Sequence, residues 1–551
     1  MKANGSKEVA DVLIIGGGAS GGVAGRHLAQ SGYDVVCLEQ GEWTEASSFP
    51  GSKPEYEILG SKRWHPNPNV RGNPEDYPCE CTEADLPVQM YAGVGGTSLL
   101  YGGVWSRLAP SDFRARTLDG VADDWPISYE ELVPFFEQTE REVGASGLPD
   151  NPAYPHGYVP PLPAHPINKA GRLAAEGMNR LGWHWWPAYQ GIPSQAYGNQ
   201  AGCVRYGVCM LGCPEGAKAS TDITHWRVAL RHGAQVVTGA RVSQITLDSR
   251  GLATGAIYID RNGNEQFQRA LTVILAANGV GTPRLLLLSA SSRFPDGLAN
   301  LSGLVGKRLM LHPVMKVVGQ YDEHIEEWVG LAGGDIESMQ FYETDPSHDF
   351  ARGSKWLLQG NIGPLGTLAL WTSGEGRNEE IWGNAFTRKM KETVGHHMSW
   401  VIIPEDLPDE ANSVTLDPEL KDSDGIPAPK IRYRYSENTR RILAFNIDRA
   451  REAHESAGAK KTWVVGLDVE SGHGAMGQAH LLGTARMGDD PETSVVDRFG
   501  RAHDVPNLYV VDGSVFVTSS GNNPTGTICA LAKRTAAHIC AHARLQEVSV
   551  G

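Results

Sequence analysis

Residues 10–41 read ADVLIIGGGASGGVAGRHLAQSGYDVVCLEQG, and this stretch decides the fold. An apolar run at 12–15 ends in glycines spaced as Gly-x-Gly-x-x-Gly, and a segment with helical composition follows at 22–30. A second apolar run then ends in an acidic residue at 39. The order of strand, glycine turn, helix, strand and acid is typical of a dinucleotide-binding unit. The stretch therefore predicts a nucleotide site made of Gly16, Gly18, Ala19, Ser20, Gly21 and Glu39.

Each feature of this unit has a physical reason. Gly16 allows the tight turn, Gly18 lets a pyrophosphate approach the backbone, and Gly21 lets the helix pack closely on the strand. The free N–H groups and the positive dipole of the helix N-terminus attract phosphate. Glu39 stands where an acid binds the ribose hydroxyls of an ADP group, and no Arg follows it, which disfavours NADP. A purely structural turn is the alternative, because a glycine fingerprint alone is weak evidence.

Composition limits the class of protein. The chain has 551 residues, enough for more than one domain, and its net charge of −15 argues against binding to nucleic acid or to an anionic membrane. No apolar run suggests a membrane span. Residues 1–11 lack the apolar segment of a secretory leader, and 8 Cys in a chain of this length do not form a disulfide scaffold. These observations predict a cytoplasmic location.

Segments with nucleotide-binding character lie at both ends and in the middle of the chain. Strand-like runs occupy 236–247, 255–259, 271–277 and 507–512, and helical patterns occupy 123–143, 172–181, 278–289, 439–456 and 523–542. The remaining segments are inserted between them, so we expect two interleaved domains. The nucleotide-binding domain is expected at 1–45, 90–120, 200–312 and 460–551. The substrate-binding domain and connecting loops are expected at 46–89, 121–199 and 313–459.

Three stretches together resemble the glucose–methanol–choline (GMC) oxidoreductase family of flavoproteins. They are the N-terminal fingerprint, GVGGTSLLYGGVWSR at 93–107, and a block from HLLGTARMG at 480 to residue 539. NGVGTPRLLLLS at 278–289 is similar to a further family signature, although the usual Ser-Gly-Ile-Gly ending is missing after Ser289. The resemblance implies an α/β fold, α+β overall, with a Rossmann-like FAD-binding domain interleaved with a substrate-binding domain on a mostly antiparallel sheet. It also implies an enzyme, an FAD-dependent oxidoreductase acting on CH–OH groups.

The resemblance assigns further residues to the cofactor site. The glycine-rich loop would pass the flavin ring, the backbone of a valine would meet the adenine, and an Asp-Gly pair would lie near the ribityl chain. These residues are Gly96, Thr97, Ser98, Tyr101, Gly102, Val104, Val242, Asp512, Gly513, Asn523, Pro524 and Thr525. Fungal pyranose oxidases of this family attach FAD through a His in the glycine loop, and residues 93–107 contain none. The FAD is therefore expected to be non-covalent.

Oxidation of an alcohol requires a base for the hydroxyl proton and a polar group that holds the substrate oxygen while a hydride leaves for flavin N5. By resemblance the base is His480 in HLLGT, and its partner is Asn523 in GNNPT. Asn522 is an alternative, but Pro524 directly after Asn523 fits the family better. The alternative role for His480 is that of a capping or core histidine.

Three cysteines lie close together in the sequence CVRYGVCMLGCP, at Cys203, Cys209 and Cys213. The preferred interpretation is a structural loop that packs on the flavin domain, as in family members with a similar Gly-Cys-Pro loop, and no metal is expected. A three-iron cluster is the alternative, because three thiolates can ligate one and some sugar dehydrogenases of the family hold one there. A zinc site would need a fourth ligand, for example His225.

Aromatic residues are frequent in the inserted regions, and aromatic faces stack on pyranose rings. They are Trp183, Trp185, Trp186, Trp371, Trp382, His396, His397 and Trp400. They favour a sugar or glycoside as substrate, with a sterol, aliphatic or aromatic alcohol as the alternative. The electron acceptor is expected to be O2, a protein or a quinone. A flavoprotein without redox turnover is the alternative from another class, and the presence of both His480 and Asn523 argues against it.

Overall fold

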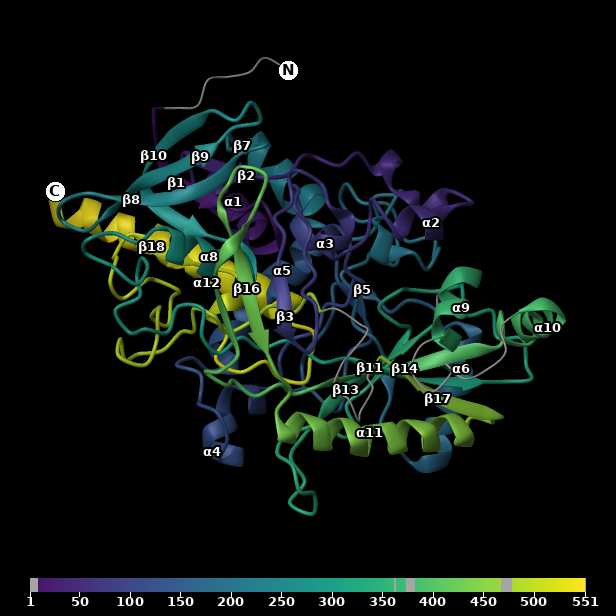
Figure 1. Cartoon of the computed structure of the whole chain (residues 1–551). Coiled ribbons are helices and arrows are strands. Elements are labelled where there is room, and N and C mark those ends of the chain that lie inside the picture. Colours follow the sequence, from purple (N-terminus) through teal and green to yellow (C-terminus); the bar gives the residue numbers. More distant parts are fainter. Residues whose placement is uncertain (1–7, 361–362, 373–381, 467–477, 551) are drawn as a thin grey trace.

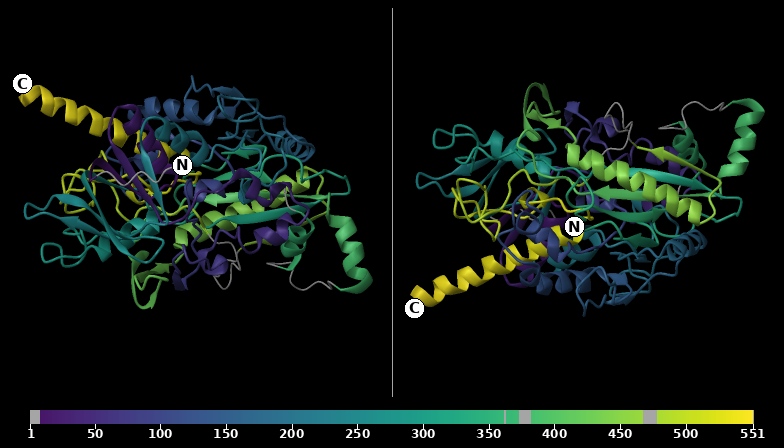
Figure 2. Two further views of the ribbon diagram at one scale, coloured as in Figure 1. Left: turned by 90° about the horizontal axis from the view of Figure 1, so that it is seen from above. Right: turned by 90° about the horizontal axis from the view of Figure 1, so that it is seen from below.

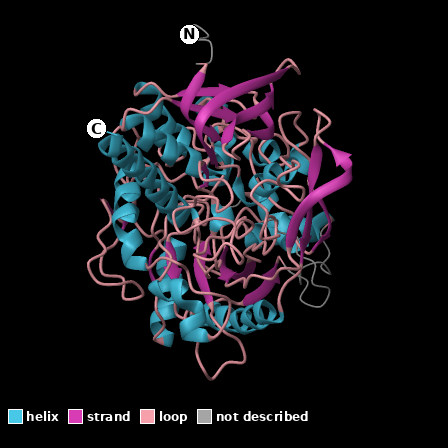
Figure 3. Ribbon diagram, turned by 90° about the vertical axis from the view of Figure 1, so that its left-hand side faces the viewer, coloured by secondary structure: helices cyan, strands magenta, loops and turns pink. Residues whose placement is uncertain are grey.

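The computed structural model describes residues 8–360, 363–372, 382–466 and 478–550 (Figure 1). Two large sheets lie at opposite ends of the molecule, and much of the chain between them is loop (Figure 3). The N-terminal strand belongs to one sheet, and the second sheet is formed by inserted segments.

The first sheet is built on the predicted nucleotide-binding unit. Strand β1 (Val9–Ile15), helix α1 (Ala19–Gln30) and strand β2 (Val35–Glu39) follow in the expected order, with β1 and β2 parallel. The full order is β7 (Gln235–Thr238), β2, β1, β10 (Glu265–Leu275), β9 (Ala253–Ile259) and β8 (Arg241–Leu247), and β18 (Leu508–Val510) also pairs with β10. The pairs β2–β7, β1–β2, β1–β10 and β10–β18 are parallel, and β8, β9 and β10 form an antiparallel meander.

Two glycines of the fingerprint are required by close backbone contacts. Gly16 has a φ of +104°, and a Cβ there would lie 2.5 Å from the carbonyl oxygen of Ala276. A Cβ at Gly21 would lie 2.1 Å from the carbonyl oxygen of Gly16. Both distances are far below van der Waals contact, so no other residue fits without moving the turn.

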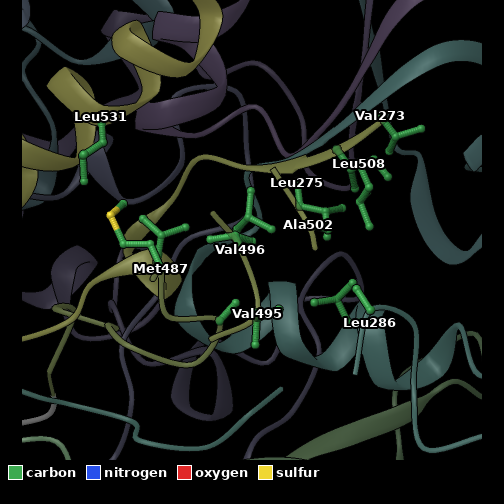
Figure 4. Packing of buried hydrophobic residues seen from close by; sticks show 14 of the residues in the cluster. Val273, Leu275, Leu286, Met487, Val495, Val496, Ala502, Leu508 and Leu531 are labelled. Carbon is green, nitrogen blue, oxygen red and sulfur yellow. The ribbon is translucent and has the colours of Figure 1, made fainter. Parts of the chain in front are cut away.

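One core cluster of this half lies between the sheet and helix α8 (Asn278–Leu288), and a second lies between the sheet and α1. Figure 4 shows Val273 and Leu275 of β10 and Leu508 of β18 in one buried cluster with Leu286 of α8. Near the end of β10, Val273 and Leu275 belong to this cluster and Ile274 belongs to a second cluster, so the strand is covered on both faces there. Helix α12 (Thr525–Val550) packs on α1 and α5 (Tyr129–Val143), and its C-terminal part extends away from the body (Figure 2).

The second sheet is antiparallel throughout, as expected. Its order is β17 (Lys461–Val465), β11 (Met315–Gln320), β14 (His397–Pro404), β13 (Ser354–Gln359), β12 (Ile336–Ser338) and β6 (Trp186–Pro187). Helix α11 (Glu437–Ser456) covers one face and packs beside α6 (Lys169–Leu181). Residues that alternate along β11, β13 and β14 therefore point either to α11 or to the interior of the molecule.

Smaller elements complete the fold. A third sheet pairs β15 (Ser413–Lys421), β16 (Pro427–Tyr433) and β3 (Glu80–Ala84), and β4 (Ser146–Gly147) pairs with β5 (Leu162–Pro163). The remaining helices are α2 (Tyr56–Gly60), α3 (Pro68–Arg71), α4 (Ala115–Asp119), α7 (Arg227–Arg231), α9 (Pro364–Thr372) and α10 (Gly383–Thr393). Within the described ranges, none of the helices is long and apolar enough to cross a membrane.

Two segments do not follow the expected domain ranges. Strand β17 pairs with β11 in the second sheet, although 460–551 was expected to belong to the nucleotide-binding domain. Helix α5 packs on α12 in the first half, although 121–199 was expected in the other domain. In α5 the side chain of Ser128 accepts the N–H of Glu131 as N-cap, but a helical pattern does not reveal which sheet the helix will cover.

Candidate active site

A cavity of about 870 Å³ is lined by residues of both halves of the molecule. Ile15, Leu38 and Glu39 reach it from the carboxyl ends of β1 and β2, and Ala276 follows β10. Ligands of parallel α/β sheets bind at this edge. The opposite part of the lining comes from the second sheet, with Val314, Lys316, Leu357, Gln359, Val401 and Ile403. The cavity therefore joins a nucleotide half to a second half that can receive a small molecule.

The glycine turn forms a cradle in the nucleotide half. Gly18, Ala19 and Ser20 line the cavity at the N-terminus of α1, and no side chain caps that end of the helix. A Cβ at Gly18 would meet nothing closer than the Cα of Gly96, 3.9 Å away, so it would occupy open space. Gly16 also lines the cavity, whereas Gly21 packs behind the turn and does not. Bare backbone at a helix N-terminus fits a pyrophosphate.

Glu39 lines the cavity but also holds the surrounding loops together. Its Oε2 accepts the N–H of Gly17 at 2.7 Å, and its Oε1 accepts those of Gly41 at 2.9 Å and Gly93 at 3.1 Å. Burial raises the pKa of this carboxyl group, and the backbone N–H bonds oppose that rise. A carboxylate has about four acceptor sites, and Glu39 uses most of them to hold these loops. The sequence did not indicate that Glu39 also accepts hydrogen bonds from the backbone of the surrounding loops.

The other residues assigned to the cofactor by resemblance lie around the same cavity. Those on the glycine-rich loop are Gly96, Thr97, Ser98, Tyr101, Gly102 and Val104, and those elsewhere are Val242, Asp512, Gly513, Asn523, Pro524 and Thr525. The carboxylate of Asp512 accepts the hydroxyl of Thr282 at 2.6 Å and the N–H of Asn278 at 3.1 Å, which fixes the start of α8 beside the cavity. The shape and the polar lining fit FAD.

His480 lines the cavity and forms a hydrogen bond with a second histidine. The Nδ1 atoms of His480 and His312 are 2.7 Å apart, and Nε2 of His312 is 2.6 Å from the carbonyl oxygen of Ser520. A carbonyl oxygen only accepts, so Nε2 of His312 carries its proton and Nδ1 of His312 is an acceptor. The hydrogen-bond network thus assigns the proton between the rings to Nδ1 of His480. Nε2 of His480 is left unprotonated.

Burial keeps both rings neutral. It lowers the pKa of His312 to about 4, and it lowers the pKa of His480 well below its ordinary value, with a smaller contribution from His312. His312 is fully buried and is not part of the cavity lining. Ser520, whose carbonyl orients His312, has a φ of +63°, which is uncommon for a residue other than glycine. A neutral imidazole with a bare Nε2 in a cavity is suited to accept a proton.

The two adjacent asparagines have different surroundings. Asn523 lines the cavity, and its buried Oδ1 has no hydrogen-bond partner among the described residues. Asn522 does not line the cavity, and its Nδ2 donates to the carbonyl of Arg107 at 2.7 Å and to the hydroxyl of Tyr154 at 3.0 Å. A buried polar atom without a partner is costly unless a ligand supplies one. Of the two asparagines, Asn523 is therefore the one that lines the cavity with an unused acceptor, and Asn522 holds the loop.

The loop that carries Cys203, Cys209 and Cys213 lies next to the glycine-rich loop. Nζ of Lys218, which follows the loop, donates to the carbonyl oxygens of Leu99 at 2.8 Å, Tyr101 at 3.0 Å and Cys209 at 2.6 Å. Burial and the neighbouring thiols raise the pKa of Cys203 to about 12. In the part of the chain that the structure describes, no three or more His, Cys, Asp or Glu side chains are placed to hold a metal ion. His225 bonds instead to Thr224 and Glu142.

The aromatic residues expected to stack on a sugar do not line the cavity. Trp183, Trp371 and Trp400 pack within apolar clusters, and Trp382 is exposed at the surface. Trp185, Trp186, His396 and His397 are likewise absent from the lining. The aromatic richness of the inserted regions is explained by packing at most of these positions.

Two residues of the site were missed by sequence reasoning. His312 precedes Pro313 at the entry to β11 and belongs to no motif considered, and Lys316 lies on the same strand. A charged residue inside an otherwise apolar strand, MKVV at 315–318, is the signal that could have drawn attention to Lys316.

Comparison with known proteins agrees with this geometry. The sequence profile of the GMC oxidoreductase family matches residues 10–314 and 408–532. The chain is 40% identical to 2-methyl-1,2-propanediol dehydrogenase of Mycolicibacterium austroafricanum, over 97% of this chain and 96% of that protein. It is 29% identical to the fructose dehydrogenase large subunit of Gluconobacter japonicus, over 96% and 97% of the two chains.

A solved structure supports the fold. Pyridoxine 4-oxidase from Mesorbium loti superposes with a TM-score of 0.66 at 19% identity, covering 96% of this chain and 99% of that one. With matches over most of its length and a cavity whose lining fits FAD, the chain belongs to the GMC oxidoreductase family and is an FAD-binding oxidoreductase that acts on alcohols.

Proposed function

We propose that the chain oxidises a carbinol group of a small, hydroxyl-rich molecule, either a diol or a sugar or glycoside. The observation that carries this proposal is that His480, which has a bare Nε2, and Asn523, whose Oδ1 has no partner among the described residues, line the same cavity. Bound FAD would supply the hydride acceptor, its flavin N5. Nε2 of His480 takes the hydroxyl proton, and the amide Nδ2 of Asn523 donates a hydrogen bond to the same oxygen.

Charge develops on the substrate oxygen as its proton leaves, and this chain has groups that stabilise it. Pro524 and Thr525, at the N-terminus of α12, line the cavity, so the positive end of that helix dipole faces the site. When His480 becomes an imidazolium, its Nδ1–H donates to the neutral His312 and stabilises the charge.

The residues that would hold FAD are those of the glycine turn, Glu39, the glycine-rich loop, Val242, and Asp512 with Gly513. The bare helix N-terminus would take the pyrophosphate, and Glu39 a ribose hydroxyl. We expect the FAD to be non-covalent, because residues 93–107 offer no His for attachment.

Two substrate classes remain, and different observations support them. A small diol is favoured by the aliphatic lining from Val314, Leu357, Val401 and Ile403, and by the relative that acts on 2-methyl-1,2-propanediol. A sugar or glycoside is favoured by the similarity to a fructose dehydrogenase subunit, although no Trp lines the described part of the cavity. The cytoplasmic location and the electron acceptor stay predictions.

Anaerobic mixing of the yellow holoenzyme with single alcohols tests the proposal. We expect bleaching of the flavin absorbance by 2-methyl-1,2-propanediol or by a sugar such as fructose, and loss of bleaching in the variant His480→Ala. A holoenzyme that no diol, sugar or glycoside in the panel bleaches would contradict the proposed function.

A further inference from the structure

Lys316 places a positive charge in the substrate half of the cavity. It lies on β11, with Val401 of β14 as its partner in the sheet and Leu357 of β13 next in the same row. All three residues line the cavity. Along this row of the sheet, the neighbours of Lys316 that line the cavity are therefore aliphatic side chains.

The described residues offer this ammonium group neither a hydrogen bond nor an ion pair, and the fully buried lysines differ in this respect. Lys218 donates to three carbonyl oxygens, Lys355 lies 2.7 Å from a carboxylate oxygen of Glu337, and Lys533 lies 2.6 Å from one of Glu142. His397 on β14 is affected by the charge of Lys316 but does not pair with it, because burial, aided by that charge, lowers the pKa of His397 to about 4 and keeps it neutral. An unpaired charge in an apolar setting is costly, and such groups concentrate at sites where a ligand compensates them.

We infer that Lys316 recognises an anionic group, of the carboxylate type, on the diol or sugar that this enzyme oxidises. The inference rests on the proposed function, since it names the substrate class of the same site. The carboxylate would accept from Nζ of Lys316, while His480 and Asn523 contact the hydroxyl that is oxidised. Gln359, which also lines the cavity from β13, offers an amide group for the same ligand. Among diols and sugars, the enzyme would then favour those that carry a carboxylate over neutral ones of the same size.

A ligand that cannot react separates binding from turnover. 2-Hydroxy-2-methylpropanoate carries a carboxylate and a tertiary hydroxyl, whose carbon has no hydrogen to give up as hydride. Its binding to the holoenzyme is followed by the change in flavin absorbance, with tert-butanol as the neutral counterpart. We expect the wild type to bind the carboxylate at least tenfold more tightly than tert-butanol, because charge-assisted hydrogen bonds are about twice as strong as neutral ones.

Three variants complete the test. Lys316→Met should lose about tenfold or more in affinity for the carboxylate and bind tert-butanol as before, and Lys316→Arg should keep the preference for the anion. Lys421→Met, which removes an equal charge from an exposed position, should behave as the wild type. Equal carboxylate affinity in wild type and Lys316→Met, or a wild type that prefers tert-butanol, would overturn the inference. Flavin reduction by neutral alcohols tests the proposed function independently of these affinities.

Discussion

Replacing His312 tests whether this buried residue controls the base. In His312→Leu the acceptor for Nδ1–H of His480 is lost, so the proton can move to Nε2, the nitrogen that must receive the hydroxyl proton. We expect slower flavin reduction with unchanged FAD content, because His312 is not part of the cavity lining.

The size of the effect follows from the hydrogen bond that is removed. It is 2.7 Å long and becomes charge-assisted when His480 is protonated. Such a bond contributes about 1.5–3 kcal/mol. At about 1.36 kcal/mol for each factor of ten, flavin reduction should slow by roughly 10- to 150-fold. Anaerobic stopped-flow mixing with saturating substrate measures this rate directly.

Matched variants separate positioning from loss of stability. His454 is another fully buried histidine with two hydrogen bonds, to the hydroxyl of Tyr321 and the carbonyl of Val317, and it lies outside the cavity. His454→Leu should lower thermal stability to a similar extent. It should leave the reduction rate within a factor of about two of the wild type, because distant sites that share no partner affect each other by no more than about 0.3–0.5 kcal/mol. His312→Gln, which keeps an amide acceptor, should recover part of the rate. Wild-type reduction in His312→Leu, or equal slowing in His454→Leu, would refute the reasoning.

Further predictions address the base, its partner, the cofactor and the thiols. Asn523→Asp should slow flavin reduction by about a hundredfold or more, because a negative charge beside the developing alkoxide is unfavourable, whereas Asn523→His should retain more activity. Burial depresses the pKa of His480 well below 6.5. The reduction rate should therefore be constant from pH 8 to pH 6.5 and fall only at lower pH, where protonation removes the base. A decline centred above pH 6.5 would contradict this prediction. Acid precipitation should release FAD into the supernatant, and flavin that stays in the pellet would indicate a covalent bond. Iron should be substoichiometric to flavin by elemental analysis, and an excess would indicate a cluster on Cys203, Cys209 and Cys213.

Local sequence patterns predicted the elements but not all of their partners. The helices α1, α6 and α11 and most strands of the first sheet lie within a few residues of their expected positions, because apolar periodicity acts over short distances. The single run expected at 236–247 is instead two strands, β7 and β8, at opposite edges of that sheet, and β10 begins at Glu265, before the expected 271. The sheet that β17 joins and the domain that α5 covers depend on contacts with residues far away in the sequence. Dependence on distant contacts also explains why the aromatic residues were misinterpreted. Their frequency in the inserted regions suggested a sugar site, but most of them pack in apolar clusters.

The sequence by itself determined the nucleotide-binding unit, the family resemblance and the identity of His480 and Asn523 as candidates, because motifs at fixed spacing carry that information. The tertiary structure decided the chemistry available to them. Only the approach of His312 to His480 across 168 positions assigns the bare nitrogen. The folded chain also separates the two asparagines, because Asn522 bonds to Arg107 and Tyr154 whereas Asn523 lines the cavity. Only the pairing of β11, β13 and β14 places Lys316 beside aliphatic side chains of the cavity lining. Protonation and hydrogen-bond partners depend on distance in space, which a linear sequence does not give.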